Sequence, residues 1–167
     1  MKLRNMTRCG VLAAVLAVCA WLSIPLGDQA VSLQSFGVFL ALGLLGGRYG
    51  TVTVLVYLML GAAGVPVFSG FRGGFSVLLG PTGGYLWGFL AACGLYWALE
   101  RKMKLWLNMT MGMVLCYGCG TVWYYCMYAP GALCPVLMTC VVPFLIPDAI
   151  KIFLSFTISQ RLKRSIG

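Results

Sequence analysis

Residues 33–63 read LQSFGVFLALGLLGGRYGTVTVLVYLMLGAA, and this stretch decides the fold. It is long enough for two helices, and its single charged residue is Arg48. About 20 apolar residues are sufficient for one helix to cross a membrane. We therefore expect two spanning helices, over residues 33–46 and 49–63. The tight turn between them, at Gly47-Arg48, is expected to hold Arg48 at the water interface.

The composition extends this interpretation to the whole chain. Hydrophobic residues make up 61% of the 167 residues and charged residues 9%, against roughly 45–50% and about 25% in soluble globular proteins. A soluble domain of this size has no interior large enough to hide so much apolar surface. Further apolar segments lie at residues 9–26, 83–99, 105–128 and 148–160. The sequence therefore predicts a single all-α membrane domain over residues 1–167, with six transmembrane helices.

The positive charge is distributed unevenly along the chain. Twelve Lys and Arg residues face three acidic residues, which gives a formal charge of +9. All but two of the basic residues lie in the tails or in short connections, namely Lys2, Arg4, Arg8, Arg48, Arg101, Lys102, Lys104, Arg161, Lys163 and Arg164. This pattern is typical of a cytoplasmic membrane face rather than of nucleic-acid binding. We expect a multi-pass protein of the cell membrane with both termini cytoplasmic. The first helix lacks a convincing cleavage site, and we expect it to be retained.

Two connections on the opposite side are long, apolar and rich in glycine or proline. We call them the first and second outer connections, and they run over residues 64–84 and 129–147. Irregular backbone at membrane depth is tolerated where it is buried in protein or lines a cavity, and long loops are usually functional. We expect both connections to fold in over a substrate cavity.

The most informative polar residues are Asp148 and Lys151 in the last apolar segment. An ionisable residue inside a membrane is a functional-site candidate. If Pro147 lies in the first helical turn, Asp148 is near the positive helix N-terminus and Lys151 is one turn further on. Two interpretations stay open. The residues form a self-satisfied ion pair, or they offer a carboxylate and a cation to a polar ligand, and one pair can do both.

Other candidates lie in the outer connections. Arg72, between glycines, is either a solvated loop charge or a lid residue that attracts an anion. Phe75 and Tyr85 are candidates for apolar walls, although aromatic residues are common at membrane interfaces. Gln34 and Phe36 place an amide beside an aromatic ring at the start of the second predicted helix.

The sequence offers little for catalysis or metal binding. It has no histidine, so general acid-base catalysis and metal-assisted hydrolysis have few possible actors. Most of the eight cysteines lie in apolar runs, and the Cys116-x-x-Cys119 pair lacks the second pair that zinc requires. A disulfide among the cysteines between residues 126 and 140 stays open. We expect no metal, no cofactor and no enzyme activity.

Small residues recur four positions apart, which allows two helices to approach closely. The pairs are Gly43 and Gly47, Gly84 and Gly88, and Ala13 and Ala17. The alanine pair leaves one face of the first helix flat, so that a helix of this chain or of a partner subunit can pack against it.

Four segments carry a family resemblance. They are Ser32-Leu33-Gln34-Ser35, Gly64-Val65-Pro66-Val67-Phe68, Val77-Leu78-Leu79-Gly80-Pro81-Thr82-Gly83-Gly84-Tyr85-Leu86, and Pro143-Phe144-Leu145 followed by Asp148-x-x-Lys151. The chain thereby resembles the BioY family, the biotin-binding S components of energy-coupling factor transporters, over nearly its whole length. The run from Gly80 to Tyr85 is the most specific part, and it lacks the lysine and hydroxyl residue of a phosphate-binding loop. One departure is Ile146-Pro147-Asp148, where the family commonly has Pro-Gly-Asp.

The resemblance implies a six-helix protein that binds biotin from outside the cell. It also implies a transmembrane coupling subunit and two cytoplasmic ATPases as partners, which hydrolyse ATP in place of this chain. Ala13 and Ala17 match the small-residue motif through which such subunits meet the coupling subunit. Two alternatives stay open, an S component for another vitamin and a membrane subunit that is only a scaffold.

The chemistry of biotin can be compared with these residues. Biotin has a carboxylate on an apolar tail and a ureido ring that donates and accepts hydrogen bonds, so its site needs a cation, an acceptor and apolar walls. We assign Asp148 to the ureido donors and either Lys151 or Arg72 to the carboxylate. Tyr85 and Phe36 supply apolar walls, and Gln34 and Phe75 complete the expected site.

Overall fold

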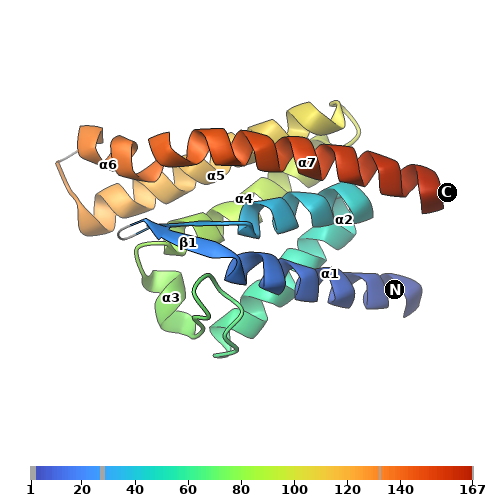
Figure 1. Cartoon of the computed structure of the whole chain (residues 1–167), viewed down its shortest axis with the longest axis horizontal. Coiled ribbons are helices and arrows are strands. Elements are labelled where there is room, and N and C mark those ends of the chain that lie inside the picture. The colour runs from blue at the N-terminus through green and yellow to red at the C-terminus, as the bar shows by residue number, and fades with distance from the viewer. Residues whose placement is uncertain (1–2, 27–28, 132, 167) are drawn as a thin grey trace.

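The computed structural model describes residues 3–26, 29–131 and 133–166, so Asp28 lies outside the described residues. Helices α1, α2, α4, α5 and α7 run side by side as a bundle, and both termini lie at the same end of it (Figure 1). The elements in chain order are α1 (Leu3–Trp21), β1 (Ser23–Leu26), β2 (Gln29–Ser32), α2 (Gln34–Ala62), α3 (Phe75–Leu79), α4 (Gly83–Leu99), α5 (Leu105–Tyr128), α6 (Leu133–Cys140) and α7 (Val142–Ile166).

Helix α2 is bent sharply at Gly46, whose φ of 78° and ψ of 173° are not helical. A positive φ of this size favours glycine. A Cβ atom on Gly50 would lie 2.8 Å from the Cα of Leu42, although eight residues of straight helix span about 12 Å. The two arms of α2 therefore fold back on each other, as the predicted hairpin requires. The break is at Gly46, next to the expected Gly47-Arg48.

The first helix ends earlier than the sequence predicted. Residues 9–26 were expected to be helical, but α1 ends at Trp21 and β1 pairs with β2 in an antiparallel hairpin. Pro25 provides the reason, because proline removes a backbone donor and disfavours helix for the residue before it. The fold is thus helical with one small hairpin.

The last helix begins earlier than the sequence predicted. Residues 148–160 were expected, whereas α7 begins at Val142 and contains Pro147 in its interior. Asp148 is therefore not in the first helical turn, and the expected contact with the helix N-terminus is absent. Membrane helices tolerate an interior proline because neighbouring groups satisfy the freed backbone. Helices α4 and α5 have the predicted bounds.

Both outer connections fold onto the bundle rather than extending from it. The first contains a short turn closed by a bridge between Phe68 and Arg72, followed by α3, and the second contains α6. Side chains of other elements donate hydrogen bonds to the carbonyl oxygens of the first connection. The pairs are Trp21 with Pro66 (2.8 Å), Trp87 with Leu78 (3.3 Å), Trp123 with Gly80 (3.1 Å) and Tyr128 with Leu79 (2.8 Å).

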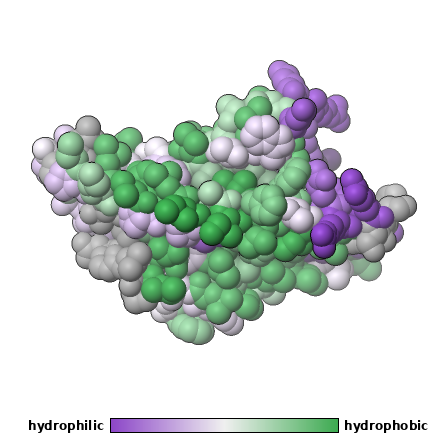
Figure 2. Space-filling model, turned by 45° about the horizontal axis from the view of Figure 1, so that its top comes forward, coloured by the Kyte–Doolittle hydropathy of each residue, from purple (hydrophilic) through white to green (hydrophobic). Residues whose placement is uncertain are grey.

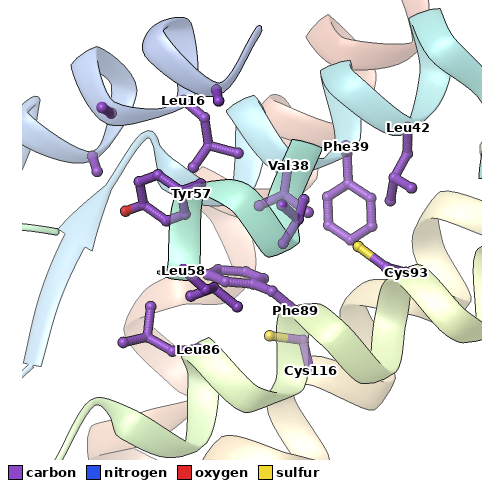
Figure 3. Close-up of a cluster of buried hydrophobic side chains, with 14 of the residues drawn as sticks. Leu16, Val38, Phe39, Leu42, Tyr57, Leu58, Leu86, Phe89, Cys93 and Cys116 are labelled. Atoms are coloured by element: carbon purple, nitrogen blue, oxygen red, sulfur yellow. The ribbon is translucent and has the colours of Figure 1, made fainter. Parts of the chain in front are cut away.

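Glycines allow the helices of the bundle to approach closely. A Cβ on Gly47 would lie 2.6 Å from the Cα of Trp97, and one on Gly88 would lie 3.1 Å from the Cα of Cys116. The predicted tight contacts at these glycines are confirmed. The core beside them joins α1, α2, α4 and α5 (Figure 3). Its labelled side chains are Leu16, Val38, Phe39, Leu42, Tyr57, Leu58, Leu86, Phe89, Cys93 and Cys116.

The surface identifies a multi-pass membrane protein. Four helices within the described residues are long and apolar enough to cross a membrane, and α4, with 17 residues, is apolar but shorter. The hydrophilic surface gathers at the end that holds both termini and the α4–α5 connection, whereas the flank is hydrophobic (Figures 1 and 2). The number of six spans and the cytoplasmic side of the termini stay predictions.

Candidate functional site

A cavity lies between the bundle and the first outer connection. The empty space within it is about 690 Å³, counting the open solvent at its mouth. Its lining comes from the start of α2, the first outer connection, α4, α5 and α7. The lining residues are Ser32, Gln34, Ser35, Phe68, Ser69, Arg72, Val77, Thr82, Tyr85, Leu86, Phe89, Met113, Cys116, Tyr117, Phe144, Asp148 and Lys151.

Asp148 is the centre of the polar part of the cavity. Its Oδ1 accepts hydrogen bonds from the Lys151 ammonium at 2.6 Å and from the Ser35 hydroxyl at 3.0 Å. Its Oδ2 accepts one from the Tyr117 hydroxyl at 2.6 Å. Asp148 and Lys151 are only 4% and 6% exposed. A buried ion pair is tolerated when further hydrogen bonds satisfy it, and this carboxylate has three donors.

Lys151 also links α7 to the last residue of β2. Its Nζ donates to the backbone carbonyl of Ser32 at 2.7 Å. An ammonium has three N–H donors, and the structure accounts for two of them. The pair is therefore self-satisfied and also lines the cavity, and its contact with a polar ligand stays a prediction.

Gln34 connects the two arms of α2 with the first outer connection. Its side-chain amide donates to the Tyr57 hydroxyl at 3.0 Å, and that hydroxyl donates to the Val67 carbonyl at 3.0 Å. The Tyr57 ring also packs edge-on against Phe68, with ring centroids 5.6 Å apart. This chain of contacts holds the first outer connection over the cavity.

Among the described residues that line the cavity, Arg72 is the one that is exposed. Its backbone carbonyl accepts from the Phe68 amide at 2.9 Å, and its Nε donates to the Ser69 carbonyl at 3.2 Å. The Ser69 hydroxyl oxygen is buried and has no hydrogen-bond partner within the described residues. A buried polar atom without a partner is costly, so a cation and an unpaired hydroxyl stand together at the mouth.

The aromatic walls rest on glycines of neighbouring helices. Tyr85 and Phe144 lie with ring centroids 6.4 Å apart. A Cβ on Gly120 would lie 2.6 Å from the Tyr85 ring, and a Cβ on Gly61 would overlap the ring of Phe68. Gly120 and Gly61 thus leave space for the rings of Tyr85 and Phe68 to pack against the helices.

The structure brings five of the seven predicted site residues together and leaves two outside. Asp148, Lys151, Tyr85, Gln34 and Arg72 all line the cavity. Phe36 and Phe75 do not line it. Whether a ring enters the cavity depends on which face of its helix is turned inward, and the sequence pattern does not determine this.

Phe36 is half-buried outside the cavity lining, and its carbonyl accepts from the Ser155 hydroxyl at 3.2 Å. Phe75 is the first residue of α3 and is 59% exposed.

The expected partner surface on α1 is also placed differently. Ala13 and Ala17 are 6% and 7% exposed and belong to the core, where α1 packs on α2. The flat face therefore serves an intramolecular contact. On the outside of α1 the small residues are Gly10 and Ala14.

Five polar lining residues were not predicted as site residues, namely Ser32, Ser35, Ser69, Thr82 and Tyr117. Ser35 belongs to one of the segments that carry the family resemblance, and its hydroxyl donates to Asp148. Tyr117 is 31 residues from Asp148, and no local pattern marks it. Ser69 lies in the first outer connection, whose inward fold was expected without a role for this hydroxyl.

Comparisons with known proteins agree with one another. The model of the BioY family matches residues 1–167. "Biotin transporter BioY" of Thermotoga maritima is 37% identical over 166 residues, which cover 97% of each chain. "Probable biotin transporter BioY" of Pyrococcus horikoshii is 34% identical over 163 residues, 98% of each chain.

A solved structure is also similar over nearly its whole length. It is the S-component for biotin from an ECF-type ABC transporter, with a TM-score of 0.86 and 29% sequence identity. The match covers 98% of this chain and 92% of that one.

Proposed function

This chain belongs to the BioY family, and on that premise we propose that it is the biotin-binding S component of an energy-coupling factor transporter. It captures biotin from the exterior for delivery across the membrane. The observation that carries the proposal is the buried Asp148–Lys151 pair, which faces a cavity with aromatic walls.

We place the ureido ring of biotin at Asp148 and Lys151. A ureido group donates through N–H and accepts through C=O, and the pair presents a carboxylate beside an ammonium, 2.6 Å apart. One ureido N–H replaces a protein donor on Asp148, and the ureido oxygen accepts from Lys151. The pair is buried, which suits the uncharged end of the ligand.

The carboxylate of biotin then lies at the mouth of the cavity. Of the two cations considered for it, Lys151 is already held by Asp148 and by the Ser32 carbonyl. Arg72 is exposed and stands beside the unpaired Ser69 hydroxyl. A carboxylate accepts from both groups, so the tail of the ligand points outward.

Binding of labelled biotin to the purified protein tests this orientation. Asp148→Asn and Lys151→Ala are expected to lower biotin affinity about 100-fold, because each leaves a buried polar group unpaired. Arg72→Ala is expected to weaken biotin about tenfold and to leave biotin methyl ester unaffected. The matched control is Arg101→Ala at the other end of the molecule.

Unchanged biotin binding by both Asp148→Asn and Lys151→Ala would contradict the site. Equal losses for biotin and its methyl ester in Arg72→Ala would contradict the orientation alone. Calorimetry with a panel of vitamins separates biotin from another vitamin as ligand, and no saturable ligand at all would favour a scaffold subunit.

For energy coupling we propose a transmembrane coupling subunit and two ATPases, with both termini of this chain cytoplasmic. The outer face of α1 offers a close contact at Gly10 and Ala14, where a Cβ on Gly10 would meet nothing within 4 Å. Gly10→Leu with Ala14→Leu is expected to block co-purification with these subunits and to spare biotin binding. Retained co-purification would exclude this face.

A further inference from the structure

A second hollow lies at the opposite end of the molecule from the biotin cavity. It is a groove between α1, the bend of α2 and the last turns of α7, with about 1140 Å³ of space counting its open side. Its lining residues are Arg4, Thr7, Arg8, Val11, Leu12, Leu44, Leu45, Leu162 and Lys163. The floor is thus aliphatic, and one rim is cationic.

The cations of this rim have no anionic partner in the described part of the chain. Arg4 and Arg8 are one turn apart on α1 and so share a face, and Lys163 approaches from α7. No carboxylate of residues 3–26, 29–131 or 133–166 lines the groove. Within the described residues, the ion pair of the structure is Asp148–Lys151, and Glu100 binds the Gly47 amide instead.

We propose that this groove binds one anionic phospholipid of the adjacent leaflet. Its phosphate lies between Arg4, Arg8 and Lys163, and one acyl chain lies along Val11 and Leu12. Each helical residue rises about 1.5 Å, so the aliphatic floor begins just below the charged rim, as a lipid requires. A basic pocket between membrane helices is suited to an anionic head group.

The charges favour a lipid over a helix of a partner protein. An apolar helix laid in the groove would cover three cations without pairing them, and burying an unpaired charge is costly. A zwitterionic lipid carries its own cation next to the phosphate and gains less. An anionic lipid matches the rim with its head group and the floor with its tail.

Native mass spectrometry of the purified protein with added phosphatidylglycerol or phosphatidylethanolamine tests the charge requirement. The wild type is expected to retain phosphatidylglycerol selectively. Arg4→Gln, Arg8→Gln and Lys163→Gln together are expected to lower its retention about tenfold or more, because each cation near an anionic head group contributes comparably. The control combines Arg101→Gln, Lys102→Gln and Lys104→Gln, which removes the same charge from the α4–α5 connection.

A steric variant tests the groove without changing charge. Val11 is 58% exposed, so Val11→Trp fills the groove without disturbing the core and is expected to displace the lipid. Val18→Trp is its control, because Val18 is 49% exposed on the same helix and lies outside the groove.

Three results would overturn the proposal. They are equal loss of phosphatidylglycerol in both charge variants, no selectivity over phosphatidylethanolamine, and full lipid retention in Val11→Trp. Full lipid retention combined with failure to assemble with a partner subunit would assign the groove to that partner. None of these readouts depends on biotin binding.

Discussion

The two ends of this molecule handle charge in opposite ways. At the end away from both termini, Asp148 and Lys151 are buried, and both oxygens of the Asp148 carboxylate have a donor. At the end with both termini, Arg4, Arg8 and Lys163 border an open groove, and none of the described residues in its lining carries a carboxylate. Buried charge requires a complete set of partners, whereas exposed charge does not. The closed network is compatible with the proposed solute site, and the exposed cations are compatible with the proposed anionic-lipid groove.

Lys151→Ala gives the largest expected effect, because it removes the counter-ion of a buried carboxylate. The free energy of unfolding should fall by about 3–5 kcal/mol, as measured by thermal or denaturant unfolding in detergent. Arg8→Ala, at the exposed end, should change it by less than about 0.5 kcal/mol. Asp148→Asn in the Lys151→Ala background should recover most of the loss. Equal effects at both ends would break the comparison.

Tyr117→Phe sharpens the account of the end away from both termini. It removes the donor to Oδ2 of Asp148, and a hydrogen bond to a charged group is worth about 1.5–3 kcal/mol. Unfolding should become easier by that amount, yet biotin affinity should not fall, because a ureido N–H takes the vacated position. Tyr125→Phe, on the same helix, is the control. A loss of affinity equal to the loss of stability would contradict the exchange of donors.

Gly120→Ala tests the wall of the cavity rather than its charges. The added Cβ would lie 2.6 Å from the Tyr85 ring, which should move into the cavity and weaken biotin about tenfold, or about 1.4 kcal/mol. Gly118→Ala is the matched control, since its Cβ would meet nothing within 4 Å. Calorimetry on both variants measures the difference, and equal affinities would show that this glycine does not set the cavity width.

Glu100→Gln gives the smallest expected effect and probes the end with both termini. The Glu100 carboxylate accepts a hydrogen bond from the Gly47 amide at 2.8 Å. Gly47 directly follows the bend of α2, so this bond acts as a cap for the second arm of the helix. Loss of such a cap costs about 0.5–2 kcal/mol, and we expect about 1 kcal/mol in a thermal unfolding assay, with biotin affinity unchanged. A loss as large as that of Lys151→Ala would mean that the bend depends on this one contact.

The sequence predicted those parts of the fold that depend on local pattern. The bounds of α4 and α5 and the turn of α2 follow from apolar length and from glycine placement. Asp148 and Lys151 were identified because charge is rare in apolar segments. The hairpin after Trp21 was missed because the apolar run continues through Pro25.

The misplaced and missing site residues depend on tertiary packing. The flat face at Ala13 and Ala17 was left open to a helix of this chain or, by the family resemblance, of a partner subunit, because a flat helix face does not determine which helix covers it. Phe36 was an equally reasonable wall residue until the rotation of α2 was known. Tyr117 reaches Asp148 from a distant part of the chain, so one sequence offers no pattern that joins the two residues.

The three donors on Asp148 have a consequence for repeated turnover. A carrier alternates between loaded and empty forms, and the empty form must return through the same apolar surroundings. In the proposed site, a departing solute would leave no bare anion behind, because Ser35, Tyr117 and Lys151 already satisfy the carboxylate. Loading would then exchange one donor for another, so neither half of the cycle would leave a buried charge unpaired.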